Sequence, residues 1–153
     1  MDALDTLDTQ LGTNTAALAG QDFLITKIEG ISFAEIRGLS GEIQIIAAAG
    51  ANTIIECVSA FINFEAGGVV YADGEAPYLA YAGDTTAIFD FDAALFRSAS
   101  CEVIRGTPSV DCIEIKRNLD VVLKVTTTDY TAGTGTADVY VIYRVISLTA
   151  CPV

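Results

Sequence analysis

Acidic side chains come nearest to a chemical motif in this sequence. The stretch FDFD places Asp90 and Asp92 two residues apart, with Asp84 shortly before them. Side chains two positions apart in a strand project from the same face, so these two carboxylates could bind one calcium ion. No surrounding loop supplies the further oxygen ligands that calcium requires. We therefore expect solvated carboxylates at a strand edge and no metal.

The four cysteines do not form a recognisable zinc or catalytic motif. Wide, irregular gaps separate Cys57, Cys101, Cys112 and Cys151, and the sequence contains no histidine. Zinc would need all four thiolates, and a cysteine or serine nucleophile would lack its usual histidine base. Cys57 and Cys112 lie in apolar patterns, where a free cysteine packs as a small hydrophobic residue. The sequence thus predicts neither an enzyme nor a cofactor, and it leaves cysteine pairing open.

The charge balance argues against anionic partners. The net charge is −12, from 20 acidic and 8 basic residues. Nucleic acids and anionic membrane surfaces are bound through clustered lysine and arginine, so we expect neither as a partner. No apolar run reaches the roughly 18 residues of a transmembrane helix. The opening MDALDTLDTQLG carries three aspartates and no base, unlike a signal peptide, which indicates synthesis in the cytoplasm.

Residues 1–22 differ from the rest of the chain. Leu4, Leu7, Leu11 and Leu18, together with Asn14, follow the spacing of heptad a and d positions. An isolated helix of this length is marginal in water. The segment is therefore interpreted as a short helix stabilised by partner copies, or as an arm that orders against another protein. A frayed tail with chance leucines is the alternative.

Residues 23–153 carry β patterns and form the second predicted unit. In NTIIECVSAFINFEAGG, alternation places Ile54, Val58, Ala60, Ile62 and Phe64 on one face. SVDCIEIKR is expected to form a strand after a turn at GTP, and DAALF could form a helical turn. About eight antiparallel strands, with turn signals every 8–12 residues, predict a single all-β domain: a jelly-roll-like sandwich or barrel.

The pattern of the final third of the chain predicts a long hairpin. Its first arm, 119–125, alternates between a core face and a mostly solvated face that includes Val122 and Lys124. Its second arm, 139–148, is apolar on nearly all positions of both faces. The Gly- and Thr-rich connection DYTAGTGTAD is typical of a mobile tip and would expose Tyr130.

A strand that is apolar on both faces lies in the centre of a sheet, or a partner subunit covers its outer face. This pattern is the first physical indication of oligomerisation. The candidate subunit interface consists of Tyr140, Ile142, Arg144 and Ile146.

Three stretches of residues 42–148 together resemble a known family. They are IQIIAAAGANTIIECVSAFINFEAGG, then VVYADG and PYLAYAG with Tyr71 and Tyr81, and finally the closing hairpin LDVVLKVTTTDYTAGTGTADVYVIYRVISL. The chain resembles the capsid decoration (cement) proteins and related head proteins of tailed bacteriophages.

The resemblance implies a non-enzymatic jelly-roll module, made in the host cytoplasm, that stabilises the shell from the outer surface of the capsid. It also implies a homotrimer that binds the major capsid protein through an N-terminal segment. Leu4, Leu7, Leu11 and Leu18 would then form the capsid-contact arm.

A receptor- or glycan-binding head domain of a phage fibre or tail protein is the alternative. Such a domain on a short trimeric coiled coil would give a similar sequence. Glycan sites favour exposed Trp or Tyr rings; this sequence has no Trp, and Tyr130 is the tyrosine expected outside the strands. An unrelated β-sandwich of the bacterial cytoplasm is also compatible with the sequence.

Overall fold

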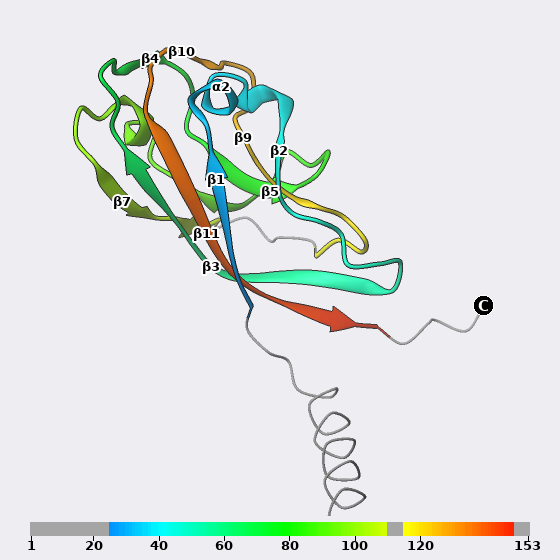
Figure 1. Cartoon of the computed structure of the whole chain (residues 1–153). Helices are drawn as coiled ribbons and strands as arrows, with labels where there is room; N and C mark the ends of the chain where they lie inside the picture. Colours follow the sequence, from blue (N-terminus) through cyan, green and yellow to red (C-terminus); the bar gives the residue numbers. More distant parts are fainter. Residues whose placement is uncertain (1–24, 110–114, 149–153) are drawn as a thin grey trace, which may run out of the picture.

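Two antiparallel sheets form the body of the protein in the computed structural model, which describes residues 25–109 and 115–148 (Figure 1). The first sheet has four strands in the order β1 (Ile25–Ile31), β11 (Thr136–Ser147), β3 (Thr53–Glu65) and β7 (Glu102–Arg105). The second sheet has five strands in the order β2 (Ile43–Ile46), β9 (Val121–Lys124), β5 (Tyr78–Tyr81), β6 (Ala87–Asp90) and β8 (Thr107–Pro108).

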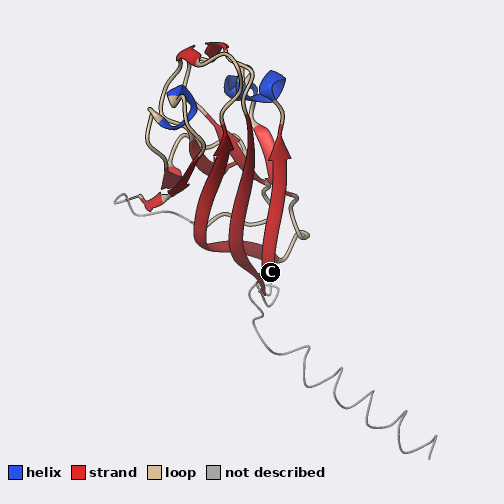
Figure 2. Cartoon of the chain, turned by 60° about the vertical axis from the view of Figure 1, so that its left-hand side comes forward, coloured by secondary structure: helices blue, strands red, loops and turns tan. Residues whose placement is uncertain are grey.

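A short two-stranded ribbon and three helical turns complete the described fold. The ribbon pairs β10 (Tyr130–Ala132) with β4 (Tyr71–Asp73). The helical turns are α2 (Phe33–Ile36), η1 (Leu39–Gly41) and η2 (Leu95–Arg97). In Figure 1, β4, β10 and α2 lie at the same end of the sheets, and Figure 2 shows how little of the described chain is helical.

The fold is an all-β sandwich, as predicted, and no closed barrel forms in the part of the chain described. Side chains from both sheets meet in one core; Ile62 and Val139 on the first sheet, and Leu79 and Leu123 on the second, are completely buried. The expectation of about eight strands missed β7, β8 and β10, which have two to four residues each. Such short runs give no period of their own in the sequence.

The predicted closing hairpin is wrong. β9 lies in the five-stranded sheet between β2 and β5, whereas β11 lies in the four-stranded sheet between β1 and β3. The segment between them crosses from one layer to the other and forms β10 on the way. Alternation shows that a segment is a strand, but it does not show which strand pairs with it.

The predicted solvated face of the first arm is also wrong. Val122 is 3% exposed and Lys124 is 9% exposed, so every residue of β9 is buried. Lys124 Nζ donates to Glu42 Oε1, with which it forms an ion pair, and to the backbone carbonyl of Asp84 at 3.2 Å. These partners offset the loss of water around a buried ammonium group.

β1 ends at Ile31, because Ser32 begins α2 with a capping box. Glu35 N–H donates to Ser32 Oγ, and Ser32 N–H donates to Glu35 Oε2 at 2.8 Å. GTP is not simply a turn, since Thr107 and Pro108 form β8. The strand expected at SVDCIEIKR lies largely outside the described residues.

An aromatic cluster fills the end of the sandwich where β4 and β10 pair. Phe96 and Tyr130 meet edge to face, with their ring centroids 5.3 Å apart, and Phe64 and Tyr71 complete the cluster. Edge-to-face contacts of this kind add stability beyond the area they bury. The tyrosine hydroxyls donate to backbone carbonyls: Tyr71 Oη to Gly135 at 2.7 Å, and Tyr130 Oη to Glu75 at 2.6 Å.

The expected exposure of Tyr130 is therefore wrong as well. Tyr130 is 1% exposed, and burial raises the pKa of its hydroxyl to about 12. Gly133 and Gly135 are present because the chain runs directly against the aromatic rings. A Cβ at Gly133 would lie 2.1 Å from Tyr71 Cδ1, and the Gly133 backbone has a φ of +70°.

Replacing Gly133 with alanine tests this packing. We expect Gly133→Ala to lower the free energy of unfolding by about 3 kcal/mol, because the new methyl group collides with the Tyr71 ring and the backbone must hold a positive φ. Urea denaturation measures the change. Gly41→Ala is the matched control, since a Cβ there meets nothing within 4 Å. Equal effects of the two substitutions would contradict the assigned role of Gly133.

Candidate interaction surfaces

The outward-facing side of the four-stranded sheet is the first candidate surface, and we call it the outer sheet face. The pairing register places Ile28, Tyr140 and Phe61 in one row across β1, β11 and β3. Residues directly opposite one another in an antiparallel sheet share a face. Ile142 and Val103 lie on the same side, two positions from this row on β11 and β7.

An aromatic stack lies at the centre of the outer sheet face. The rings of Phe61 and Tyr140 are parallel to within 9°, with centroids 4.5 Å apart. Ile28 beside them is 54% exposed, and Val103 across the face is 66% exposed. Each strand of this sheet thus has apolar residues on its core side and additional apolar residues on its outer side.

The four residues predicted as a subunit interface do lie together on this face. Tyr140, Ile142, Arg144 and Ile146 alternate along β11, and all four are half-buried in the chain. Arg144 Nε donates to Glu56 Oε2 on β3, and Ile146 lies opposite Ile54. β11 itself is central between β1 and β3, which was one of the two predicted explanations of its apolar pattern.

A β-bulge decides which residues of β3 reach this face. Ser59 pairs with Ile142 but Cys57 pairs with Tyr143, so Val58 is an extra residue with no partner on β11. Val58 is consequently 48% exposed. The predicted single face from Ile54 to Phe64 is therefore wrong, because alternation changes side at the bulge.

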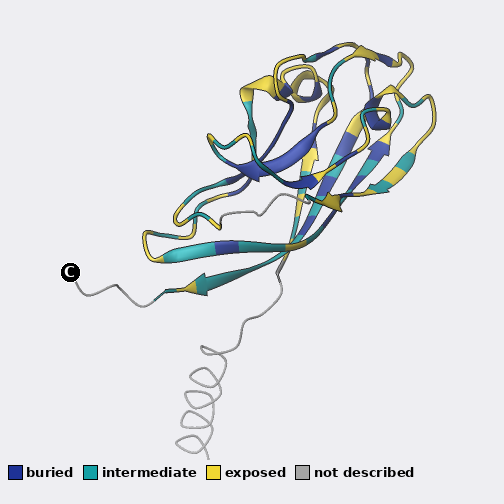
Figure 3. Cartoon of the chain, turned by 180° about the vertical axis from the view of Figure 1, so that it is seen from behind, coloured by how far each residue is buried: buried dark blue, intermediate teal, exposed yellow. Residues whose placement is uncertain are grey.

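Beyond the bulge, β3 and β11 continue as a pair. Figure 3 shows this part of both strands as mostly half-buried, in contrast to the buried strands of the second sheet. Ile55 is nevertheless 2% exposed, and its carbonyl accepts a 2.5 Å hydrogen bond from Tyr81 Oη on β5. This bond links the two sheets, and burial raises the pKa of the Tyr81 hydroxyl.

Phe61, Ile28 and Val103 were not predicted from the sequence as surface residues. The sequence pattern indicated that both faces of β11 are apolar, but the register determines which residues of the other strands lie beside them. The other predicted site residues, Leu4, Leu7, Leu11 and Leu18, lie outside the described residues.

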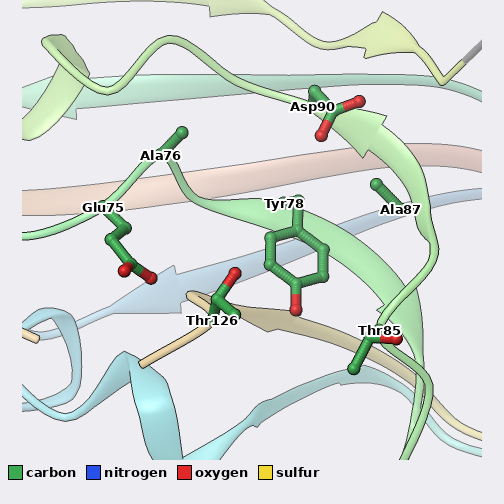
Figure 4. A pocket seen from close by; sticks show the side chains of 7 residues that line it. All are labelled: Glu75, Ala76, Tyr78, Thr85, Ala87, Asp90 and Thr126. Atoms are coloured by element: carbon green, nitrogen blue, oxygen red, sulfur yellow. The ribbon is translucent and has the colours of Figure 1, made fainter. Parts of the chain in front are cut away.

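A pocket of about 260 Å³ on the five-stranded sheet is the second candidate surface (Figure 4). It is lined by Glu75, Ala76, Tyr78, Thr85, Ala87, Asp90 and Thr126. Tyr78 lies directly between Lys124 and Asp90 in the register, so these three side chains share one face of the sheet. The pocket therefore lies over β5, with an acidic residue on the neighbouring strand.

The acidic residues considered for calcium have other roles. Asp84 Oδ1 accepts from Thr86 N–H at 3.1 Å, and Asp92 Oδ1 accepts from Ala94 N–H at 2.7 Å, as is typical of carboxylates that shape turns. The hydrogen bond from the backbone N–H of Thr86 is the main reason that the pKa of Asp84 is lowered. Within residues 25–109 and 115–148, no group of three or more His, Cys, Asp or Glu residues is placed to hold a metal ion.

The burial of Tyr130 weakens the glycan-binding alternative. That alternative depended on an exposed tyrosine near a hairpin tip, but the Tyr130 ring is buried against Phe96.

No helix in the described part of the chain is long and apolar enough to span a membrane.

Comparisons with known proteins add little to this geometry. No protein-family model and no curated protein matches the chain. Among solved structures, the chain is similar to one described as the capsid of Ralstonia phage GP4, with 14% identity over 86% of this chain and 87% of that one. The TM-score is 0.43, and at that distance the likeness assigns neither a family nor a function.

The two described cysteines are expected to differ in reactivity. Cys57 packs against the core, and burial raises the pKa of its thiol to about 12, whereas Cys101 is exposed. Because the thiolate is the reactive form, we expect iodoacetamide at pH 8 to label Cys101 and to leave Cys57 unlabelled. Peptide mass spectrometry reads the labels, and labelling in urea is the control that shows both sites are detected. Labelling of Cys57 in the folded protein at the rate of Cys101 would refute this prediction.

Proposed function

We infer that this protein is a structural, non-enzymatic virion protein: a decoration (cement) protein that binds the outer surface of a phage capsid. In this proposal it acts as a homotrimer, residues 1–22 are the arm that contacts the major capsid protein, and residues 23–153 are the sandwich domain. Its site of action is the capsid surface, after synthesis in the host cytoplasm. The sequence features that resemble decoration proteins support this assignment.

The outer sheet face is the observation that carries the proposal. Its exposed apolar residues Ile28 and Val103 lie on the same side of the sheet as the stacked Phe61–Tyr140 pair. Aromatic side chains and arginine are enriched in protein interfaces, and Arg105 lies directly opposite Phe61 on this face. Exposed apolar residues that gather on one face mark interaction sites. We assign further copies of this chain as the occupants of this face, because the apolar surface lies on the body of the domain and the arm remains available for the capsid.

Bridging contacts explain how such a protein would stabilise a shell. A trimer that carries three weak arms gains avidity, because the second and third contacts form at a high effective concentration. A protein that binds the assembled lattice better than free subunits shifts the equilibrium toward the lattice. A net charge of −12 on the bound copies would also keep the particles soluble and separate.

Placing a charge on the outer sheet face tests the trimer. We expect the unaltered chain to have three times its 16.1 kDa mass in light scattering. Ile28→Asp leaves the folded monomer nearly unperturbed, since Ile28 is 54% exposed, but it would bury a carboxylate in the trimer. We expect the dissociation constant to rise about 100-fold or more.

Val69→Asp is the matched control, because Val69 is 51% exposed but precedes β4, away from the outer sheet face. It should leave the mass unchanged. A monomer for the unaltered chain at all concentrations would reject the trimer, and a trimer for Ile28→Asp would reject this face as the contact.

The arm is tested by adding charge at its leucines in the full chain. We expect the double variant Leu7→Asp and Leu11→Asp to keep the trimer mass but to lose binding to purified capsids that lack the protein, measured by co-sedimentation. Thr6→Asp with Thr9→Asp adds the same charge off the leucine positions and should bind normally. Full occupancy by the leucine variant would reject the arm.

A further inference from the structure

The pocket over β5 holds an unusual tyrosine. Tyr78 is only 6% exposed, yet no hydrogen bond joins its hydroxyl to any residue in 25–109 or 115–148. Solvent reaches the hydroxyl oxygen, since the described residues contain no fully buried polar side-chain atom without a partner. In Figure 4 the ring points into the pocket, and its hydroxyl lies between Thr126 and Thr85. The other inward-packed tyrosines of this fold, such as Tyr71, Tyr81 and Tyr130, donate to backbone carbonyls.

Two carboxylate residues, Glu75 and Asp90, line the same pocket. Thr127 N–H donates to Glu75 Oε2 at 2.8 Å, and Thr127 Oγ1 donates to Glu75 Oε1 at 2.9 Å, so Glu75 is held in a fixed orientation. These hydrogen bonds keep the pKa of Glu75 below its usual range. Thr128 Oγ1 also donates to Glu75 Oε1, at 3.4 Å. A carboxylate offers about four lone-pair sites, so about one remains on Glu75 for the pocket. Asp90 on β6 is exposed at the opposite side.

The positive charge nearest in the register does not neutralise the pocket. Lys124 lies beside Tyr78, but its ammonium group is directed to Glu42 and to the carbonyl of Asp84. Glu42 pairs with Lys124, and no ion pair within residues 25–109 and 115–148 involves Glu75 or Asp90. The pocket thus combines acceptor oxygens, an apolar ring and two carboxylates, in a protein with a net charge of −12.

We propose that this pocket binds the guanidinium group of an arginine side chain on a partner protein. A guanidinium group is planar and has five N–H donors, which suits a site with two carboxylates and a free hydroxyl acceptor. Its flat face also packs well against an aromatic ring such as that of Tyr78. The volume of about 260 Å³ accommodates such a side chain. This inference is independent of the proposed function, because it specifies the chemistry of the partner and not its identity.

The test is an NMR titration of the full chain with Nα-acetylarginine amide. We expect shifts confined to the amides around the pocket, such as those of Ala76, Ala87 and Thr126, and an affinity that falls as salt is added. Nα-acetylcitrulline amide has nearly the same shape without the charge and should give no such shifts. Equal shifts with the citrulline compound, or with a neutral saccharide such as glucose, would overturn the assignment to a cation.

Two variants locate the site. We expect Tyr78→Phe, which keeps the ring, and Asp90→Asn, which alters an exposed side chain, each to weaken binding about fivefold to tenfold. Tyr143→Phe and Glu65→Gln remove the same groups elsewhere and should bind normally. Asp90→Asn keeps the test decisive if Tyr78→Phe does not fold, because its side chain makes no core contact. Unchanged affinity in Asp90→Asn, or absence of any shift in the unaltered chain, would refute the proposal.

Discussion

The antiparallel pairing of β3 with β11 is the constraint on which the rest of the structure depends. It runs from Glu65 opposite Thr136 to Thr53 opposite Ser147, and it places the two longest strands in the middle of the four-stranded sheet. One side of this pair closes the core through Ile62 and Val139. The other side forms the outer sheet face, with Phe61 stacked on Tyr140. The same pairing therefore supplies both the stability of the domain and its exposed apolar surface.

The connection from β9 to β11 shows how packing can override the local character of a segment. A Thr- and Gly-rich stretch normally lies at the surface, where small residues tolerate turns. Here the glycines let the backbone approach Tyr71 and Phe64 closely, and Tyr130 enters the aromatic cluster. The segment is therefore partly buried, and it joins the two sheets at the end of the domain where β4 and β10 pair. It does not cover the outer sheet face.

The two candidate surfaces lie on different sheets and have different chemistry. The outer sheet face offers apolar area, which favours another apolar surface and has little directionality. The pocket over β5 offers charge and hydrogen-bond acceptors, which select by geometry. A protein that must bind both its own copies and a different partner can use two such surfaces without competition between them. The hydroxyl of Tyr78 offers a directional hydrogen bond in the pocket, whereas the ring of Tyr140 offers apolar area on the outer sheet face.

Composition and alternation by themselves determined the class of the fold, because burying one face of each strand imposes a period of two on the sequence. They also indicated that β11 is apolar on both sides and that Tyr140, Ile142, Arg144 and Ile146 share a face. Tertiary structure decided the partner of each strand: β9 and β11 look like a hairpin in sequence, but long-range pairing separates them. It also decided the bulge at Val58, the burial of Lys124 beside Glu42, and the free hydroxyl of Tyr78. Each of these depends on residues far apart in the chain, and a local pattern carries no information about which distant residue will be opposite.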